Sequence, residues 1–174
     1  MTQIVDAAVE DERWQGVEIE AIAERAAVAT LTYLGVSTDF EISLLACDDE
    51  RIAVLNQEFR AKGQPTNVLS WPSEERGAEV EGAVPAPPEP DPQAASFGEP
   101  SELGDIAISY DTCAREAESE GKPFVNHVMH LMVHGVLHLL GYDHIREKDA
   151  LLMEKLEREI LETLSIPDPY KTTG

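Results

Sequence analysis

The segment HGVLHLLGYDH, residues 134–144, contains three histidines at its first, fifth and eleventh positions and a glycine at its eighth. On an α-helix, His134 and His138 would share one face, about one turn apart. Gly141 can adopt a left-handed conformation, end the helix and turn the chain back, which would bring His144 toward the other two. Catalytic zinc is typically held by three protein ligands plus water. The segment therefore predicts a site for one Zn²⁺ ion, although nickel or copper would also bind three imidazoles.

The residue after the first histidine limits the reaction that such a site can catalyse. Zinc peptidases with this histidine spacing carry a glutamate there, and it acts as general base on the metal-bound water. Gly135 has no side chain, so a peptidase of that mechanism is not expected. Phosphodiester cleavage by a zinc-activated water needs less from an adjacent carboxylate, because much of its catalysis is charge stabilisation. It does require a cation for the phosphate oxygens.

Arg60 is the candidate for that cation. Its guanidinium offers a fork of donors suited to phosphate, and Lys62 adds positive charge nearby. An exposed arginine at a helix end can equally do no more than complement the helix dipole. Sequence spacing does not place Arg60 near the histidines, so both interpretations stay open.

Two further histidines precede the trio. His127 and His130 fall on the same helical face as His134 and His138, within about 80°. They can line the approach to the metal, but we favour the interpretation that both are simply polar residues near the start of the helix. Neither is expected to be a metal ligand. Asp143 is a candidate for orienting a ligand or the water.

The cysteines bear on the alternative of a structural zinc site, which would need a fourth protein ligand. Neither Cys47 nor Cys113 lies near the histidines in the sequence. Both are expected to be reduced and partly buried, as in a cytosolic protein.

The elements that must position these residues interleave along the chain. Periodicity, caps and glycine stops indicate strands at about 3–9, 41–47, 67–71 and 103–109, and helices at about 17–34, 49–60, 112–120, 123–141 and 147–164. The fold class is therefore α/β or α+β, and we expect α+β: a small mixed sheet of about four strands, packed by helices, with one long metal-bearing helix.

Residues 73–100 interrupt this pattern, since they hold six of the chain's eleven prolines and almost no large apolar side chains. We expect a flexible surface insertion within a single catalytic domain of residues 1–174, with a partner-binding loop as the alternative.

The chain carries 34 acidic and 13 basic residues, a net charge of −21. This charge argues against whole-surface attraction to nucleic acid, so RNA binding would require a local basic strip. No stretch approaches the roughly 18 apolar residues of a membrane span, and the first residues lack the features of a signal peptide. We expect a cytoplasmic protein without a membrane partner.

Taken together, HGVLHLLGYDH and the upstream segments LGDIAIS and LNQEFRAKGQPTNVLSWP closely resemble the YbeY family. These are bacterial zinc-dependent, single-strand-specific endoribonucleases linked to 16S ribosomal RNA 3′-end maturation and ribosome quality control. The resemblance implies His134, His138 and His144 as zinc ligands, with His134 and Arg60 as catalytic residues. It also implies single-stranded or ribosomal RNA, not DNA, as substrate, and the small ribosomal subunit and its proteins as partners.

The chain departs from the family in the segment TNVLSW, residues 66–71, where the family usually has TDVLSF. Any role of that carboxylate is in doubt, although Asn67 keeps a hydrogen-bonding side chain. Lys62, Asn67 and Ser70 are candidates for substrate or supporting contacts. The alternatives to an endoribonuclease are a non-enzymatic zinc-containing ribosome assembly factor and, less favoured, a metallopeptidase lacking the usual base.

Overall fold

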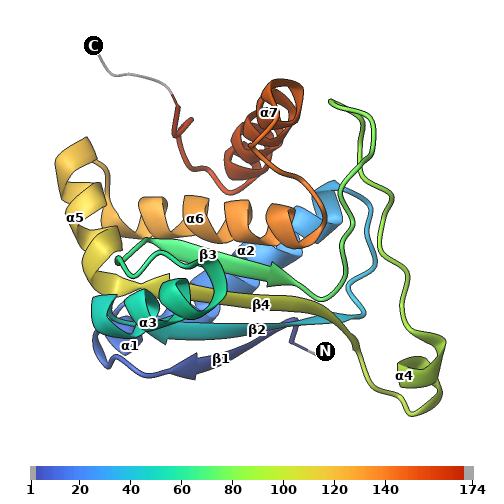
Figure 1. Cartoon of the computed structure of the whole chain (residues 1–174), viewed down its shortest axis with the longest axis horizontal. Helices are drawn as coiled ribbons and strands as arrows, with labels where there is room; N and C mark the ends of the chain where they lie inside the picture. Colours follow the sequence, from blue (N-terminus) through green and yellow to red (C-terminus); the bar gives the residue numbers. More distant parts are fainter. Residues whose placement is uncertain (1–2, 171–174) are drawn as a thin grey trace.

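A computed structural model of the protein describes residues 3–170 and has a four-stranded mixed sheet at its centre (Figure 1). The strand order is β1-β2-β4-β3, with β1 (Val5–Val9), β2 (Phe40–Cys47) and β4 (Ser101–Ser109) mutually parallel. The fourth strand, β3 (Val68–Pro72), runs antiparallel to β4 and forms an edge. The predicted α+β fold with a small mixed sheet is confirmed.

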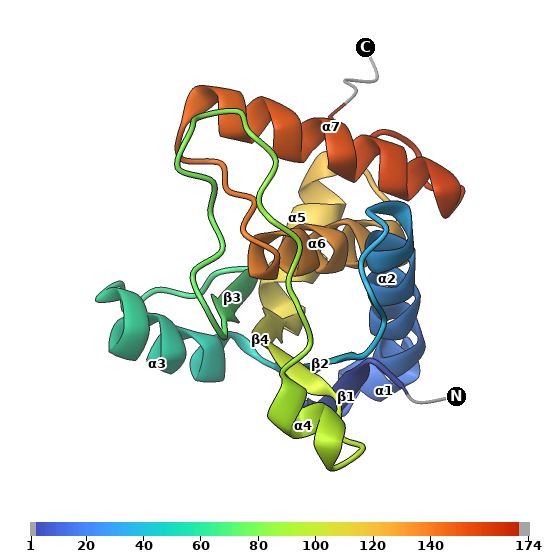
Figure 2. The ribbon, with the colours of Figure 1, turned by 90° about the vertical axis from the view of Figure 1, so that its right-hand side faces the viewer.

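The helices are α1 (Arg13–Gly16), α2 (Ile19–Tyr33), α3 (Asp49–Arg60), α4 (Pro92–Ser96), α5 (Tyr110–Glu120), α6 (Phe124–Leu139) and α7 (Glu147–Thr163). Helices α2 and α6 cover one face of the sheet, and α7 lies over α6 on the side away from the sheet (Figures 1 and 2). Most residues of α6 are buried, because it lies between the sheet and α7. Within residues 3–170, no helix is long and apolar enough to cross a membrane.

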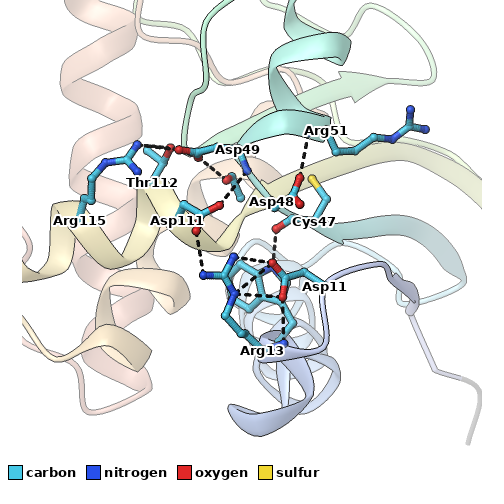
Figure 3. A network of polar contacts seen from close by, with 11 residues as sticks. Asp11, Arg13, Cys47, Asp48, Asp49, Arg51, Asp111, Thr112 and Arg115 are labelled. Carbon is cyan, nitrogen blue, oxygen red and sulfur yellow. Dashed lines mark hydrogen bonds and ion pairs between the residues drawn. The ribbon is translucent and has the colours of Figure 1, made fainter.

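Helix α3 packs on the second face of the sheet, where Ile52 joins a small core with Leu69 of β3 and Ala107 of β4. The amino end of α3 is fixed by the polar network drawn in Figure 3. The Asp49 carboxylate accepts hydrogen bonds from Thr112 (2.6 Å) and Ser109 (2.7 Å). Because these hydrogen bonds fix the first turn of α3, they also position its last turn beside the edge strand β3.

The strand expected at residues 67–71 is an edge strand, and its register explains which groups face outward. The amide of Ser109 donates to the carbonyl of Asn67, so Asn67 points its backbone groups toward β4. Alternate residues of an antiparallel edge strand point outward, which makes Val68 and Ser70 the outward-facing ones. The strand is buried on its two faces only in part and is open along one edge.

Residues 73–100, the predicted flexible insertion, contain the short helix α4 and run up from β3 to the start of α7 and back (Figure 2). The first half of the segment packs on α7. Arg146 donates to the carbonyl of Ala78 (2.7 Å), and the Gly82 amide donates to Asp149 (2.8 Å). Sequence reasoning did not foresee α1, α4 or this docking.

Candidate active site

An open cleft of about 1300 Å³ lies between α6 and the edge strand β3. It brings together residues that are far apart in the sequence. Histidines and an acid come from α6 and the turn after it, and cations and polar groups come from the end of α3, from β3 and from the loops next to them. The predicted site residues that line it are Arg60, Lys62, Asn67, Ser70, His130, His134, His138, Asp143 and His144. His127 is the one predicted candidate outside the cleft.

His134 is oriented by a carboxylate of α7. Its Nδ1 donates to Glu157 Oε2 at 3.1 Å. Within the described residues its Nε2 has no hydrogen-bond partner, and the side chain remains partly accessible from the cleft. A histidine that donates its other ring N–H to a carboxylate is the usual arrangement of a metal-ligating imidazole.

His138 is oriented in the same sense by the backbone. Its Nδ1 donates to the carbonyl oxygen of Tyr142 at 3.2 Å, in the turn that follows α6. Burial lowers the pKa of His138, which favours the neutral imidazole that metals bind. The two helical histidines therefore both present Nε2 as the remaining ring nitrogen.

His144 lies on the returning turn, with its ring centroid 5.3 Å from that of His134. The turn depends on Gly141, whose φ is +104° and whose added Cβ would meet the Arg76 carbonyl oxygen at 2.5 Å. The predicted left-handed glycine that returns the chain is thus confirmed. The His144 side chain is mostly exposed and lies beside Asp143.

The donor chemistry of this cluster fits zinc, although the cluster is not closed. Two imidazoles have their Nδ1 atoms engaged and their Nε2 atoms unpaired, as the ligands of a catalytic zinc require. Among residues 3–170, no group of three histidine, cysteine, aspartate or glutamate side chains is arranged so that it could hold a metal ion. Coordination by all three predicted histidines therefore requires a side-chain movement, for which the exposed His144 is placed.

Glu157 is the site residue that sequence reasoning missed. It is 1% exposed and, besides His134, accepts from His130 Nε2 (2.5 Å) and Tyr170 Oη (2.6 Å). Burial would raise the pKa of Glu157, but the hydrogen bonds from His130 and His134 outweigh it and lower the pKa to about 2. The available signal was a carboxylate on the apolar face of α7, directly after Leu156.

His130 and His127 turn out to have different surroundings. His130 lines the cleft and is tied to Glu157, so it supports the histidine cluster from one side. His127 is buried, and its Nε2 lies 2.9 Å from Glu116 Oε1, away from the cleft. His127 therefore lies outside the cleft as a buried polar residue near the start of α6, whereas His130 makes a contact with Glu157 that the sequence did not indicate.

Arg60 reaches the cleft from the last turn of α3. One of its Nη atoms donates to the outward carbonyl of Ser70 at 2.9 Å, and Asn67 Oδ1 accepts from the outward amide of Val68 at 2.6 Å. These two side chains cover part of the open edge of β3, which limits the pairing of another strand there. The remaining N–H groups of the exposed guanidinium stay available for a ligand.

In the part of the chain that the structure describes, the cations of the cleft have no carboxylate partners. Arg60, Lys62 and Arg76 form no ion pair with any acidic side chain of the described residues. In a chain of net charge −21, cations beside a cleft would ordinarily be neutralised. They supply local positive charge for an anionic ligand, in a cleft that Glu75, Glu79 and Asp143 also line.

Gly135 faces the sheet and not the cleft. A Cβ at this position would lie 3.1 Å from Ile106 Cδ1 of β4, so the helix approaches the sheet closely here. A glutamate at this position would point into apolar core, which explains in structural terms why the peptidase base is absent.

Comparison with known proteins places this geometry in context. The family model described as Endoribonuclease YbeY matches residues 5–165. The Endoribonuclease YbeY of Ruegeria pomeroyi is 55% identical over 167 residues, which cover 95% of this chain and 97% of the relative. That of Paracoccus denitrificans is 54% identical over 168 residues, covering 97% and 90% respectively. The solution structure of TM1509 from Thermotoga maritima has the same fold, with a TM-score of 0.53 and 19% identity over 98% of both chains.

Proposed function

Because this chain belongs to the YbeY family of endoribonucleases, we propose that it is a zinc-dependent endoribonuclease that cleaves single-stranded RNA. We further propose that its substrate is ribosomal RNA, that it acts in 16S 3′-end maturation and late ribosome quality control in the cytoplasm, and that the small ribosomal subunit is its partner. The activity is supported by the family and the site, whereas the biological role is supported by the resemblance alone.

The observation that carries the activity is the juxtaposition within one cleft of oriented imidazoles and unpaired cations. His134 and His138 come from one helix, while Arg60 ends helix α3 on the opposite face of the sheet and Lys62 follows it in the loop. Each half alone has a simple structural explanation. Only a ligand that binds metal and carries negative charge uses both, and a phosphodiester does so.

The residues have distinct tasks in this proposal. His134, His138 and His144 hold the zinc ion, which when bound acts as a Lewis acid and lowers the pKa of a water molecule that reaches it. Glu157 keeps His134 in the tautomer with Nε2 free. Arg60, fixed by the Ser70 carbonyl, directs its other N–H groups at the phosphate oxygens and stabilises their developing charge. Lys62 adds attraction for the strand at longer range.

Replacement of Arg60 tests this assignment. Arg60→Ala should lower kcat for single-stranded RNA by roughly 100-fold, as loss of a charged donor at a transition state does. Arg25→Ala is the matched control, because Arg25 is an exposed arginine of α2 outside the cleft that also lacks a carboxylate partner within residues 3–170. Equal kcat values for the two variants would show that Arg60 only covers the edge of β3.

The ribosomal role needs a separate test. Cells that lack the protein should accumulate 16S RNA with an extended 3′ end, and the wild-type chain should correct this while His134→Ala should not. Correction by His134→Ala would favour a non-enzymatic assembly factor.

A further inference from the structure

One rim of the cleft carries an aromatic pair for which the catalytic chemistry has no use. Phe59, in the last turn of α3, is 62% exposed. Its ring meets that of Trp71 of β3 edge to face, with centroids 5.4 Å apart. Both side chains line the cleft that contains His134 and His138. Trp71 therefore holds in place an aromatic ring that stays largely open to solvent.

The same pair borders a second, shallow hollow of about 510 Å³ on the part of the sheet face that α3 leaves uncovered. Its floor is apolar, with Leu45, Leu55 and Ala107. Asp6 and Asp105 also line it, and Asp105 is the direct cross-strand neighbour of Trp71. The aromatic pair thus lies between a cleft lined by cations as well as by Glu75, Glu79 and Asp143, and a hollow lined by carboxylates without a cation.

This distribution of charge determines how a single strand can lie. Phosphates are attracted to Arg60 and Lys62, which follow Phe59 in the chain and have no carboxylate partner among the described residues. Asp6 and Asp105 repel phosphates from the hollow. The uncharged, planar part of a nucleotide is the part that suits the aromatic rim.

We propose that Phe59, supported by Trp71, is the stacking site for one unpaired nucleobase of the RNA, whose neighbouring phosphate lies at Arg60 and Lys62. The proposal rests on the proposed function and adds a reason for single-strand specificity. A base within a duplex is already stacked on its neighbours, whereas an unpaired base can be placed on a protein ring. Because every base has a π-face, the site would tolerate many sequences.

The first test compares kinetic constants of the metal-loaded, full-length protein on a short single-stranded RNA. Phe59→Ala should raise KM by about 5- to 100-fold, the effect of losing one base–aromatic stack, with kcat largely unchanged. Phe59→Tyr keeps the ring and should restore KM. Phe97→Ala is the matched control, because Phe97 is 73% exposed and lies outside the cleft. Similar KM values for Phe59→Ala and Phe97→Ala would overturn the stacking site.

The second test reads the aromatic rim directly. The chain has two tryptophans, and Trp14 is fully buried, so a change in fluorescence on binding reports mainly on Trp71. A 2′-O-methyl RNA, verified on a gel to stay intact, should quench this emission. A chain of the same length that keeps its phosphates but lacks bases should bind more weakly and quench little. Equal affinity and equal quenching by the two chains would refute base stacking.

The two proposals fail in different ways. If the wild-type protein neither cleaves nor binds single-stranded RNA, the proposed function is wrong and the stacking site is wrong with it. If Arg60→Ala lowers kcat while Phe59→Ala behaves as the Phe97→Ala control does, the proposed function stands and only the stacking site is wrong.

Discussion

Replacement of Glu157 by glutamine should weaken both the fold and the metal site. The carboxylate is 1% exposed and accepts hydrogen bonds from His130, His134 and Tyr170. Glutamine has nearly the same shape, but it offers one acceptor oxygen and places an NH₂ group against donors. At least one of the three partners must therefore lose its hydrogen bond or change its orientation.

The size of the effect on stability follows from this burial. Hydrogen bonds to a charged group contribute about 1.5–3 kcal/mol each, and an amide retains part of them. We expect Glu157→Gln to lower the free energy of unfolding of the metal-free protein by about 2–4 kcal/mol at pH 7. The carboxyl pKa falls from 4.5 to about 2 on folding, a difference that corresponds to about 3 kcal/mol. This contribution is complete above pH 4.5, decreases as the pH falls below that value, and is lost near pH 2.

The metal affinity should change in parallel. Loss of a carboxylate that orients a ligating histidine typically weakens metal binding by about 10- to 100-fold. Zinc titration of the metal-free variant would measure this, and ¹⁵N shifts of the His134 ring would report its tautomer. Glu162→Gln is the matched control, since Glu162 is exposed on α7 and its carboxylate makes no hydrogen bond or ion pair within residues 3–170.

A simple structural role would give a different result. If Glu157→Gln lost stability but kept wild-type zinc affinity and an unchanged His134 tautomer, Glu157 would be a buried packing group and the account of the site would be wrong on this point.

Three other substitutions or treatments have definite expected outcomes. Gly135→Glu should lower the free energy of unfolding by about 3 kcal/mol or more, because the new side chain meets Ile106 and buries a charge. The variant should have no activity on casein. Cleavage of casein by this variant would contradict the placement of residue 135. Gly141→Ala should lower the free energy of unfolding by about 1–3 kcal/mol and weaken zinc binding, because the φ of Gly141 is +104°. A zinc affinity equal to that of the wild type would show that the turn does not position His144. Cys47 and Cys113 are buried, and burial raises the pKa of Cys47 to about 12. Neither thiol should therefore react with iodoacetamide at pH 8 until the protein is unfolded. Rapid labelling of the folded protein would contradict the packing of this core.

Much of the site could be predicted because its signals are local. The four-residue spacing of His134 and His138 defines a helical face, and Gly141 marks the turn by its own conformational freedom. The same reasoning located all four strands and five helices, since periodicity and caps act over a few residues.

The rest depends on long-range packing. Nothing near Glu157 in the sequence indicates that α7 lies over α6 and brings this carboxylate to His134. The approach of Arg60 to the cleft depends on the sheet order that makes β3 an edge strand. His127 and His130 share a helical face, and yet only His130 reaches the cleft, because Glu116 of α5 pairs with His127 near the start of α6.

The most direct test of the central claim measures zinc content and RNA cleavage on the same purified samples of wild type and His134→Ala. We expect the wild type to hold about one zinc ion per chain and to cleave single-stranded RNA, with the activity lost on chelation and restored by zinc. His134→Ala, with its fold verified by circular dichroism, should have lost most of its zinc and its cleavage together. Cleavage by the folded, zinc-free variant at the wild-type rate would contradict the account.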